Sequence, residues 1–288
     1  MIDSRANLSG VRTRHRLRAR RASVGPTARL GRFQLPKVSL GSPRRRDVAV
    51  MALSAFGLLA AVLLLPWLLR WAPEPIASAA ADFGEGAKTT LELTFISGTL
   101  GLFIGAVVGL MRISPAFLPR QASAFYVWVI RGTPLIVQIL CVYFVVPTLV
   151  PALKVSDFTS AAIALALNVA AYNAEILRGC LQAIPKGQFD AARSLGLRRG
   201  QTLRLVILPQ AARIAIPPLV NNIVGLLKDS SLAYVIGVVE LSLVGNRLQA
   251  ATFRPVPVFV ATAAVYLLMT TFLSTFSGAL ERRVCGQK

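Results

Sequence analysis

Acidic residues, histidine and cysteine are all scarce in this chain, and each shortage excludes a class of function. Only 12 of the 288 residues are Asp or Glu, one is His, and the three Cys are far apart. Metal sites and disulfide frameworks need such residues at short, paired spacings, so we expect neither. The stretch from Gly84 to Thr89 resembles a phosphate-binding loop, but Ala87 stands where that motif needs glycine. We therefore expect a chain that is not an enzyme, holds no cofactor and hydrolyses no ATP itself.

Apolar residues are abundant, because 55% of the chain is hydrophobic and only 15% is charged. Soluble domains carry about a quarter charged residues, and a membrane-spanning helix needs about 20 mostly apolar ones. Five segments reach that length: 48–69, 91–113, 125–150, 158–177 and 256–280. A sixth, 214–243, is interrupted by Lys228, Asp229, Ser230 and Ser231, so we expect two shorter helical pieces there. The sequence predicts an all-α fold, a polytopic transmembrane bundle of about six spans.

The basic residues are distributed unevenly, and 13 of the 32 Lys and Arg precede residue 49. Lys and Arg favour the cytoplasmic side of a membrane, so we expect both termini and the loop 178–213 to be cytoplasmic. Residues 1–47 have too little apolar surface to fold alone. We expect a disordered cytoplasmic tail that touches anionic lipid. Aromatic residues do not alternate with the arginines, so we expect no nucleic-acid partner.

The long loop 178–213 should contain two short helical pieces. The first, 188–195, is expected to end at Gly196, and the second, 200–208, is expected to stop at Pro209. In the first piece Phe189, Ala192 and Gly196 share one face, which predicts an exposed aromatic knob for a partner's groove. A helix this short is unstable alone in water and must pack on the loop or on another protein.

In the second span, Gly101, Gly105 and Gly109 recur every four residues. This spacing places them on one stripe of the helix, where another helix can approach closely. The stripe predicts a polytopic bundle and says nothing about a substrate.

Gln188-Phe189-Asp190-Ala191-Ala192-Arg193, followed by Gly196, is the first of five ordered segments that resemble a known family. It is similar to the coupling motif in the permease subunits of ABC importers, although that family usually has Glu where Asp190 stands. The other four resemble the polar amino-acid branch, which includes histidine and glutamine permeases. They are Arg131–Leu135 with Val137-Gln138, Ala171–Gly179, Ile207–Ala211 and Leu227–Leu232. The similarity covers residues 86–281, a predicted five-span permease core, and leaves 48–70 as a first transmembrane helix outside it.

The resemblance implies a permease subunit of an ATP-driven importer for polar amino acids, in a bacterial cytoplasmic (inner) membrane. A pair of ABC ATPase subunits would use the ATP and dock on the helix 188–196. Its implied coupling residues are Gln188, Phe189, Asp190, Ala191, Ala192 and Gly196. A second permease subunit, identical or homologous, would complete the pathway, and an extracytoplasmic solute-binding protein would deliver the solute.

Three alternatives predict different behaviour. An ABC permease for another small polar metabolite would keep the same machinery. An ion-driven secondary transporter would need no docking helix and no ATPase, and a membrane scaffold or receptor would carry no solute.

Polar residues inside the predicted spans are candidates for the translocation pathway, because such residues are costly in a membrane. Asn168, Tyr172 and Glu175 share a face of the fourth span; Glu175 could pair with Arg178 or meet a solute's amino group. Lys228 and Asp229 mark a kink that could face the pathway or be fixed by charge pairs. Gln138 could line the pathway or form an interhelical hydrogen bond.

Overall fold

The computed structural model describes residues 45–285, and within this range the chain forms helices and no strands. The predicted all-α fold is confirmed. The predicted basic tail, 1–47, lies outside the described residues except for its last three. In chain order the elements are α1 (Arg45–Leu69), α2 (Ala80–Arg112), α3 (Phe117–Gly132), α4 (Leu135–Leu140), the π-helical η1 (Cys141–Val145), α5 (Val146–Leu149), the 3-10 helix η2 (Pro151–Leu153), α6 (Asp157–Gln182), α7 (Lys186–Ser194), α8 (Arg199–Gln201), the π-helical η3 (Thr202–Ile207), α9 (Leu208–Asp229), the 3-10 helix η4 (Ser230–Ile236), α10 (Leu241–Thr252) and α11 (Pro255–Cys285).

Five helical stretches of the described chain are long and apolar enough to cross a membrane. They are Arg46–Leu69, Ala80–Arg112, Asp157–Gln182, Arg199–Ile236 and Pro255–Val284. A bent pair, Phe117–Gly132 with Leu135–Leu149, would make a sixth if it counts as one span. The prediction of about six spans is confirmed on length and composition.

The prediction of a single spanning helix over 125–150 is wrong, because the structure has two helices there. The helical axis bends by 109° between Gly132 and Leu135. Pro134 accounts for this bend, because a proline disfavours helical geometry at the residue before it. Thr133 is accordingly extended, with φ −118° and ψ 146°, and α3 ends at Gly132.

The expected stop at Pro209 is also wrong, because one helical stretch runs from Arg199 to Ile236. The π-helical turns of η3 lie directly before this proline, which occupies the first turn of α9. Proline is tolerated in a helix where its missing N–H is not needed and where local π-helical turns adjust the backbone.

The predicted interruption after Lys228 is present, since the α-helix ends at Asp229. The second piece is the 3-10 helix η4, which ends at Gly237 with a left-handed φ of +92°. The segment 214–243 is therefore not one continuous α-helix: η4 continues the stretch Arg199–Ile236, and α10 begins separately at Leu241.

Helix α2 begins at Ala80, eleven residues before the predicted start at residue 91. The charged residues of its first three turns lowered the apparent hydropathy of this stretch. Asp82 and Glu85 lie on the exposed face, whereas Phe83, Gly84 and Ala87 on the other face are buried. A helix can be charged on one side and still pack on the other.

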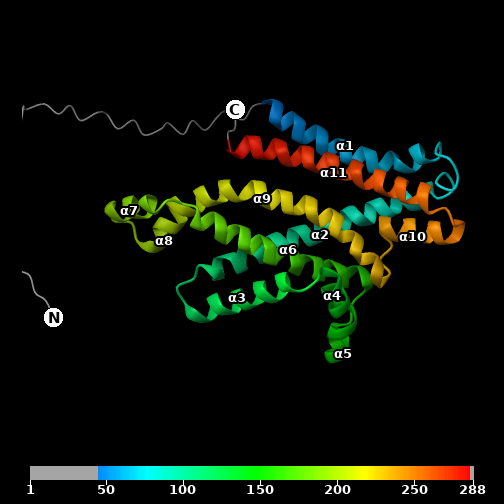
Figure 1. Ribbon diagram of the computed structural model, residues 1–288. Coiled ribbons are helices and arrows are strands. Elements are labelled where there is room, and N and C mark those ends of the chain that lie inside the picture. The colour runs from blue at the N-terminus through cyan, green and yellow to red at the C-terminus, as the bar shows by residue number, and fades with distance from the viewer. Residues whose placement is uncertain (1–44, 286–288) are drawn as a thin grey trace, which may run out of the picture. The chain divides into compact units, whose positions relative to one another are not determined.

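Helix α1 packs beside α11 and shares a hydrophobic cluster with α2, α10 and α11 (Figure 1). Val62 and Leu65 are its buried contributions to this cluster. Arg282 Nε lies 3.3 Å from Asp47 Oδ1, which places the start of α1 beside the end of α11.

The predicted glycine stripe is a close helix–helix contact between α2 and α6. A Cβ atom added at Gly105 would lie 2.6 Å from Asn173 Cβ and 2.9 Å from the Ala170 carbonyl oxygen. One at Gly101 would overlap Val169, and one at Gly109 would lie 3.2 Å from Leu177 Cβ. Only glycine lets the two backbones approach this closely.

Candidate functional site

The short helix α7 has the boundaries that the loop sequence predicted to within two residues. It follows Pro185 and ends before Gly196, whose φ is +76°. The Leu197 N–H donates to the Ala192 carbonyl at 3.1 Å, which closes the helix end. This arrangement is the Schellman motif, and glycine fits its left-handed position without strain. Figure 1 shows α7 and α8 together at one end of α6 and α9.

Phe189 is not the exposed knob that the sequence predicted. It is half-buried and packs on a cluster of Leu181, Ile184, Ile207 and Ala211, so it anchors α7 on the chain's own loop. Ala192 points the same way and is 2% exposed. The exposed residues of this region include Gln188, Asp190, Ala191 and Leu195, and Leu195 is 80% exposed. Leu195 is the apolar surface residue that sequence reasoning missed.

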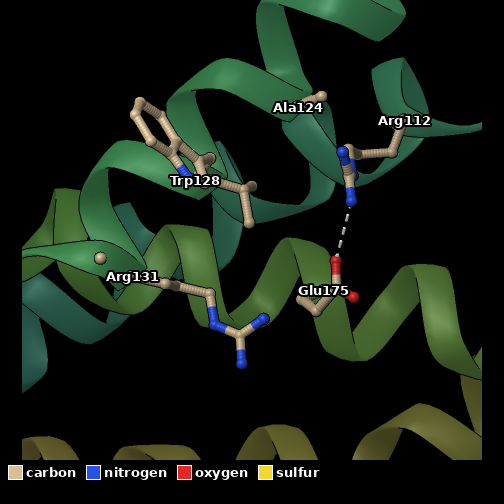
Figure 2. A pocket seen from close by; sticks show the side chains of 7 residues that line it. Arg112, Ala124, Trp128, Arg131 and Glu175 are labelled. Carbon is tan, nitrogen blue, oxygen red and sulfur yellow. Dashed lines mark hydrogen bonds and ion pairs between the residues drawn. The ribbon is translucent and has the colours of Figure 1, made fainter.

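Glu175 forms the ion pair with Arg178 that was one of its two predicted roles. Arg178 Nε lies 3.0 Å from both carboxylate oxygens, and Nη2 also contacts Oε1. The structure adds a second cation from α2, since Arg112 Nη2 lies 3.2 Å from Glu175 Oε2 (Figure 2). Sequence reasoning missed Arg112 because the two residues are 63 positions apart. With two guanidinium groups on its oxygens, Glu175 is a structural link between α2 and α6.

Tyr172 and Arg131 meet across α6 and α3. The guanidinium carbon of Arg131 lies 5.2 Å from the centre of the Tyr172 ring, within cation–π range. A cavity of about 460 Å³ lies between Arg112, Ala124, Val127, Trp128, Arg131, Gly132 and Glu175. Figure 2 shows Arg112, Ala124, Trp128, Arg131 and Glu175 among the residues that line this space. Two arginines and one carboxylate line it, so its surroundings carry a net positive charge.

Gln138 and Asn168 form one hydrogen-bonded unit. Asn168 Nδ2 donates to Gln138 Oε1 at 3.0 Å, and Gln138 Nε2 donates to the carbonyl oxygens of Ile130 at 2.7 Å and Thr133 at 3.0 Å. These bonds satisfy backbone groups that the bend before α4 leaves free. The interhelical hydrogen bond is thus the role with direct support, and pathway roles for both residues stay predictions.

Lys228 and Asp229 form no ion pair within 4 Å in the part of the chain that is described. Both side chains are exposed at the end of α9. The alternative in which charge pairs with other residues fix the kink therefore has no support here. Lys228 instead lines a cavity of about 400 Å³ with Ser231, Ser242, Phe259, Thr262, Ala263 and Tyr266.

Two buried polar residues were not predicted. Glu240 is 0% exposed and caps α10, accepting from the N–H groups of Ser242 and Leu243, both at 2.9 Å. Asn173 is 0% exposed, donates to the Gly101 carbonyl at 3.3 Å and accepts from Asn222 at 2.9 Å. Glu240 could have been found as an ionisable residue inside an apolar segment, just before a helix.

Comparisons with known proteins bear on this arrangement of helices and loop. The family model described as "Binding-protein-dependent transport system inner membrane component" matches residues 100–285. The chain belongs to this family. The predicted resemblance to ABC importer permeases is thereby confirmed, and the chain is a membrane transport component.

The match to individual relatives extends over most of the length of each relative. The glutamine transport system permease protein GlnP of Escherichia coli (strain K12) is 40% identical over 200 residues, which are 69% of this chain and 91% of that protein. The L-cystine transport system permease protein TcyB of Bacillus subtilis (strain 168) is 36% identical over 222 residues, 76% of this chain and 92% of that protein. The crystal structure of an amino acid ABC transporter with histidines is 36% identical, with a TM-score of 0.68, over 72% of this chain and 96% of that chain.

Proposed function

We propose that this chain is the membrane-spanning permease subunit of an ATP-driven importer for polar amino acids. It forms half of the translocation pathway with a second permease subunit and docks an ATPase subunit through α7. An extracytoplasmic solute-binding protein delivers the amino acid. Relatives named for glutamine, L-cystine and arginine transport support the substrate class, since their names share polar amino acids.

The construction of α7 is the observation that carries the docking proposal. A helix of nine residues is too short to persist alone, and the inward packing of Phe189 and Ala192 holds it in place. This packing leaves Asp190, which pairs with Arg193 at 3.9 Å, and Leu195 exposed to a partner. A rigid, outward-facing helix can transmit the motion of that partner to α9, because η3 connects the loop to α9 without a break.

The proposed orientation places both termini in the cytoplasm. The ion pair between Asp47 and Arg282 supports it in part, because the start of α1 and the end of α11 then lie on one side of the membrane. The basic residues of the loop 178–213 support a cytoplasmic position for this loop.

The docking proposal is tested by a pair of substitutions at Gly196. Gly196→Val introduces a β-branched residue at a φ of +76°, whereas Gly196→Asn keeps a residue that tolerates this conformation. The purified permease is reconstituted with its ATPase, and ATP hydrolysis stimulated by the loaded solute-binding protein is measured. We expect Gly196→Val to lose the stimulation, and Gly196→Asn to keep most of it.

Asp190→Lys reverses an exposed charge of α7 and should also uncouple hydrolysis, while Lys154→Met, in a distant loop, serves as the control. Normal stimulation in both Gly196→Val and Asp190→Lys would show that the ATPase docks elsewhere.

A further inference from the structure

The cavity between α2, α3 and α6 is lined by two arginines, Arg112 and Arg131, to which the proposed function gives no role. We propose that this cavity binds the phosphate of an anionic phospholipid from the cytoplasmic leaflet, with the two guanidinium groups as its ligands. Such a site concerns the lipid around the permease and goes beyond the transport of a solute.

The charges around the cavity do not cancel. Arg112 and Arg178 share the Glu175 carboxylate, with Arg112 Nη2 at 3.2 Å from Oε2. Arg131, by contrast, has no carboxylate within 4 Å in the described part of the chain. Its guanidinium carbon lies 5.2 Å from the centre of the Tyr172 ring, which is neutral and leaves the positive charge uncompensated. Charged side chains in membrane-spanning stretches meet counter-charges, so we expect an anion from outside this part of the chain.

Arg112 gives a second and independent indication of a missing acceptor. Its Nε atom is buried and has no hydrogen-bond partner among the described residues. A buried N–H without an acceptor costs free energy, and such groups are rare in native proteins. Arg112 lines the same cavity as Arg131 (Figure 2). A phosphate held by both guanidinium groups would supply acceptors to each, because its oxygens match the fork of donors on arginine.

The position and the aromatic border of the cavity favour a lipid as the source of the phosphate. Arg112 is the last residue of α2, and Glu175 lies near the end of α6, which the proposed orientation places on the cytoplasmic side. Basic pockets between membrane-spanning helices on this side bind anionic headgroups. Trp128 is 72% exposed, and its ring centre lies 6.0 Å from that of Phe125, which is 65% exposed. Exposed aromatic rings are typical of the level of the lipid headgroups.

The size and net charge of the cavity predict which phospholipid it prefers. Its volume of about 460 Å³ is in the usual range of small-molecule pockets, so it has room for a phosphate with the attached glycerol. Phosphatidylglycerol carries one negative charge. Phosphatidylcholine also carries a phosphate, but its trimethylammonium group neutralises that charge. A cavity with surplus positive charge should therefore select phosphatidylglycerol over phosphatidylcholine.

Trp128 allows lipid at the cavity to be measured directly, because it lines the cavity and is one of only three Trp in the chain. Trp67→Phe and Trp71→Phe, both at exposed positions, leave Trp128 as the single fluorescent indole. The full-length permease with these two changes is reconstituted into vesicles of mixed phosphatidylglycerol and phosphatidylcholine. One lipid at a time carries brominated acyl chains, which quench a neighbouring Trp. The two quenching curves give the ratio of the binding constants of the two lipids beside Trp128.

We expect phosphatidylglycerol to bind about 5-fold more strongly than phosphatidylcholine, the effect of one basic residue near an anionic lipid. Arg131→Met should lower this ratio to about 1, because it removes the uncompensated charge. Arg131→Lys should keep most of the preference, which also shows that the site tolerates substitution at this position. Arg120→Met is the matched control, since Arg120 is an exposed residue of the same helix that does not line the cavity, and it should keep the ratio of the unsubstituted chain.

Equal binding of the two lipids, or an unchanged ratio in Arg131→Met, would overturn the inference. The same loss of preference in Arg120→Met would mean a general attraction of lipid to α3, and no quenching by either lipid would mean that protein covers the cavity. Inorganic phosphate, added at constant ionic strength, should leave the ratio unchanged; displacement of phosphatidylglycerol would assign the cavity to a soluble anion instead. All of these contrary outcomes are compatible with ATP-driven uptake, so they leave the proposed function intact.

Discussion

The contact between α2 and α6 makes a sharp prediction about Gly105→Ala. A Cβ atom at this position would lie 2.6 Å from Asn173 Cβ, whereas ordinary van der Waals contact begins at 3.4 Å. Neither Asn173 Cβ nor the Ala170 carbonyl can move without its backbone, so the helices must separate by about 0.8 Å, the difference between those two distances. Extra atoms in a packed core cost about 1–3 kcal/mol.

Separating α2 from α6 would also weaken two hydrogen bonds of Asn173. Asn173 joins the Gly101 carbonyl of α2 to Asn222 of α9, and both bonds lengthen if α6 moves away from α2. The higher helix propensity of alanine offsets about 0.5–1 kcal/mol of the loss. We therefore expect Gly105→Ala to destabilise the chain by about 2 kcal/mol.

The matched control is Gly225→Ala, because Gly225 lies within α9 and a Cβ atom there meets nothing within 4 Å. Thermal stability of both variants is measured in the same detergent by size-exclusion chromatography of heated samples. Gly105→Ala should lower the midpoint temperature, and Gly225→Ala should leave it unchanged or raise it slightly. Equal midpoints for the two variants would refute the close approach of α2 and α6.

Three further substitutions test single contacts. Glu175→Gln leaves Arg112 and Arg178 without their shared carboxylate and should lower the free energy of unfolding by about 2 kcal/mol, measured by thermal unfolding. It should not change which amino acids compete for uptake. A changed competition profile would instead favour a solute-contacting role. Tyr126→Phe removes the 2.6 Å hydrogen bond to the Leu167 carbonyl and should cost about 1 kcal/mol in the same assay, and no loss would mean that α3 is held by apolar packing alone. Glu240→Gln weakens the cap of α10 and should speed amide hydrogen exchange in its first turn by mass spectrometry; unchanged exchange would contradict the capping role.

The sequence predicted the helices well where apolar runs and helix-ending residues agree. The runs 158–177 and 256–280 lie inside α6 and α11, and Gly196 ends α7 within one residue of the expected place. The errors occurred at two prolines, where the surrounding sequence gave conflicting indications about whether the helix continues. Pro134 was treated as part of an apolar run although it bends the chain, and Pro209 was treated as a stop although η3 accommodates it.

The candidate sites were less predictable, because they depend on residues far apart in the chain. The i, i+3 spacing alone indicates the pair of Glu175 with Arg178, but Arg112 joins only through the packing of α2 on α6. The cavity at Lys228 takes its other lining residues from η4, α10 and α11, so it depends on tertiary structure. Phe189 was expected outward because helical spacing defines a face without saying which surface that face meets.

The central claim is that this permease moves solute only when a separate ATPase drives it. The most direct measurement is uptake of radiolabelled L-glutamine, L-arginine and L-cystine into proteoliposomes, with the permease alone or together with its ATPase, the solute-binding protein and Mg-ATP. We predict uptake of at least one of them only in the complete, ATP-supplied system. Uptake by the permease alone, driven by a proton or sodium gradient, would contradict the claim.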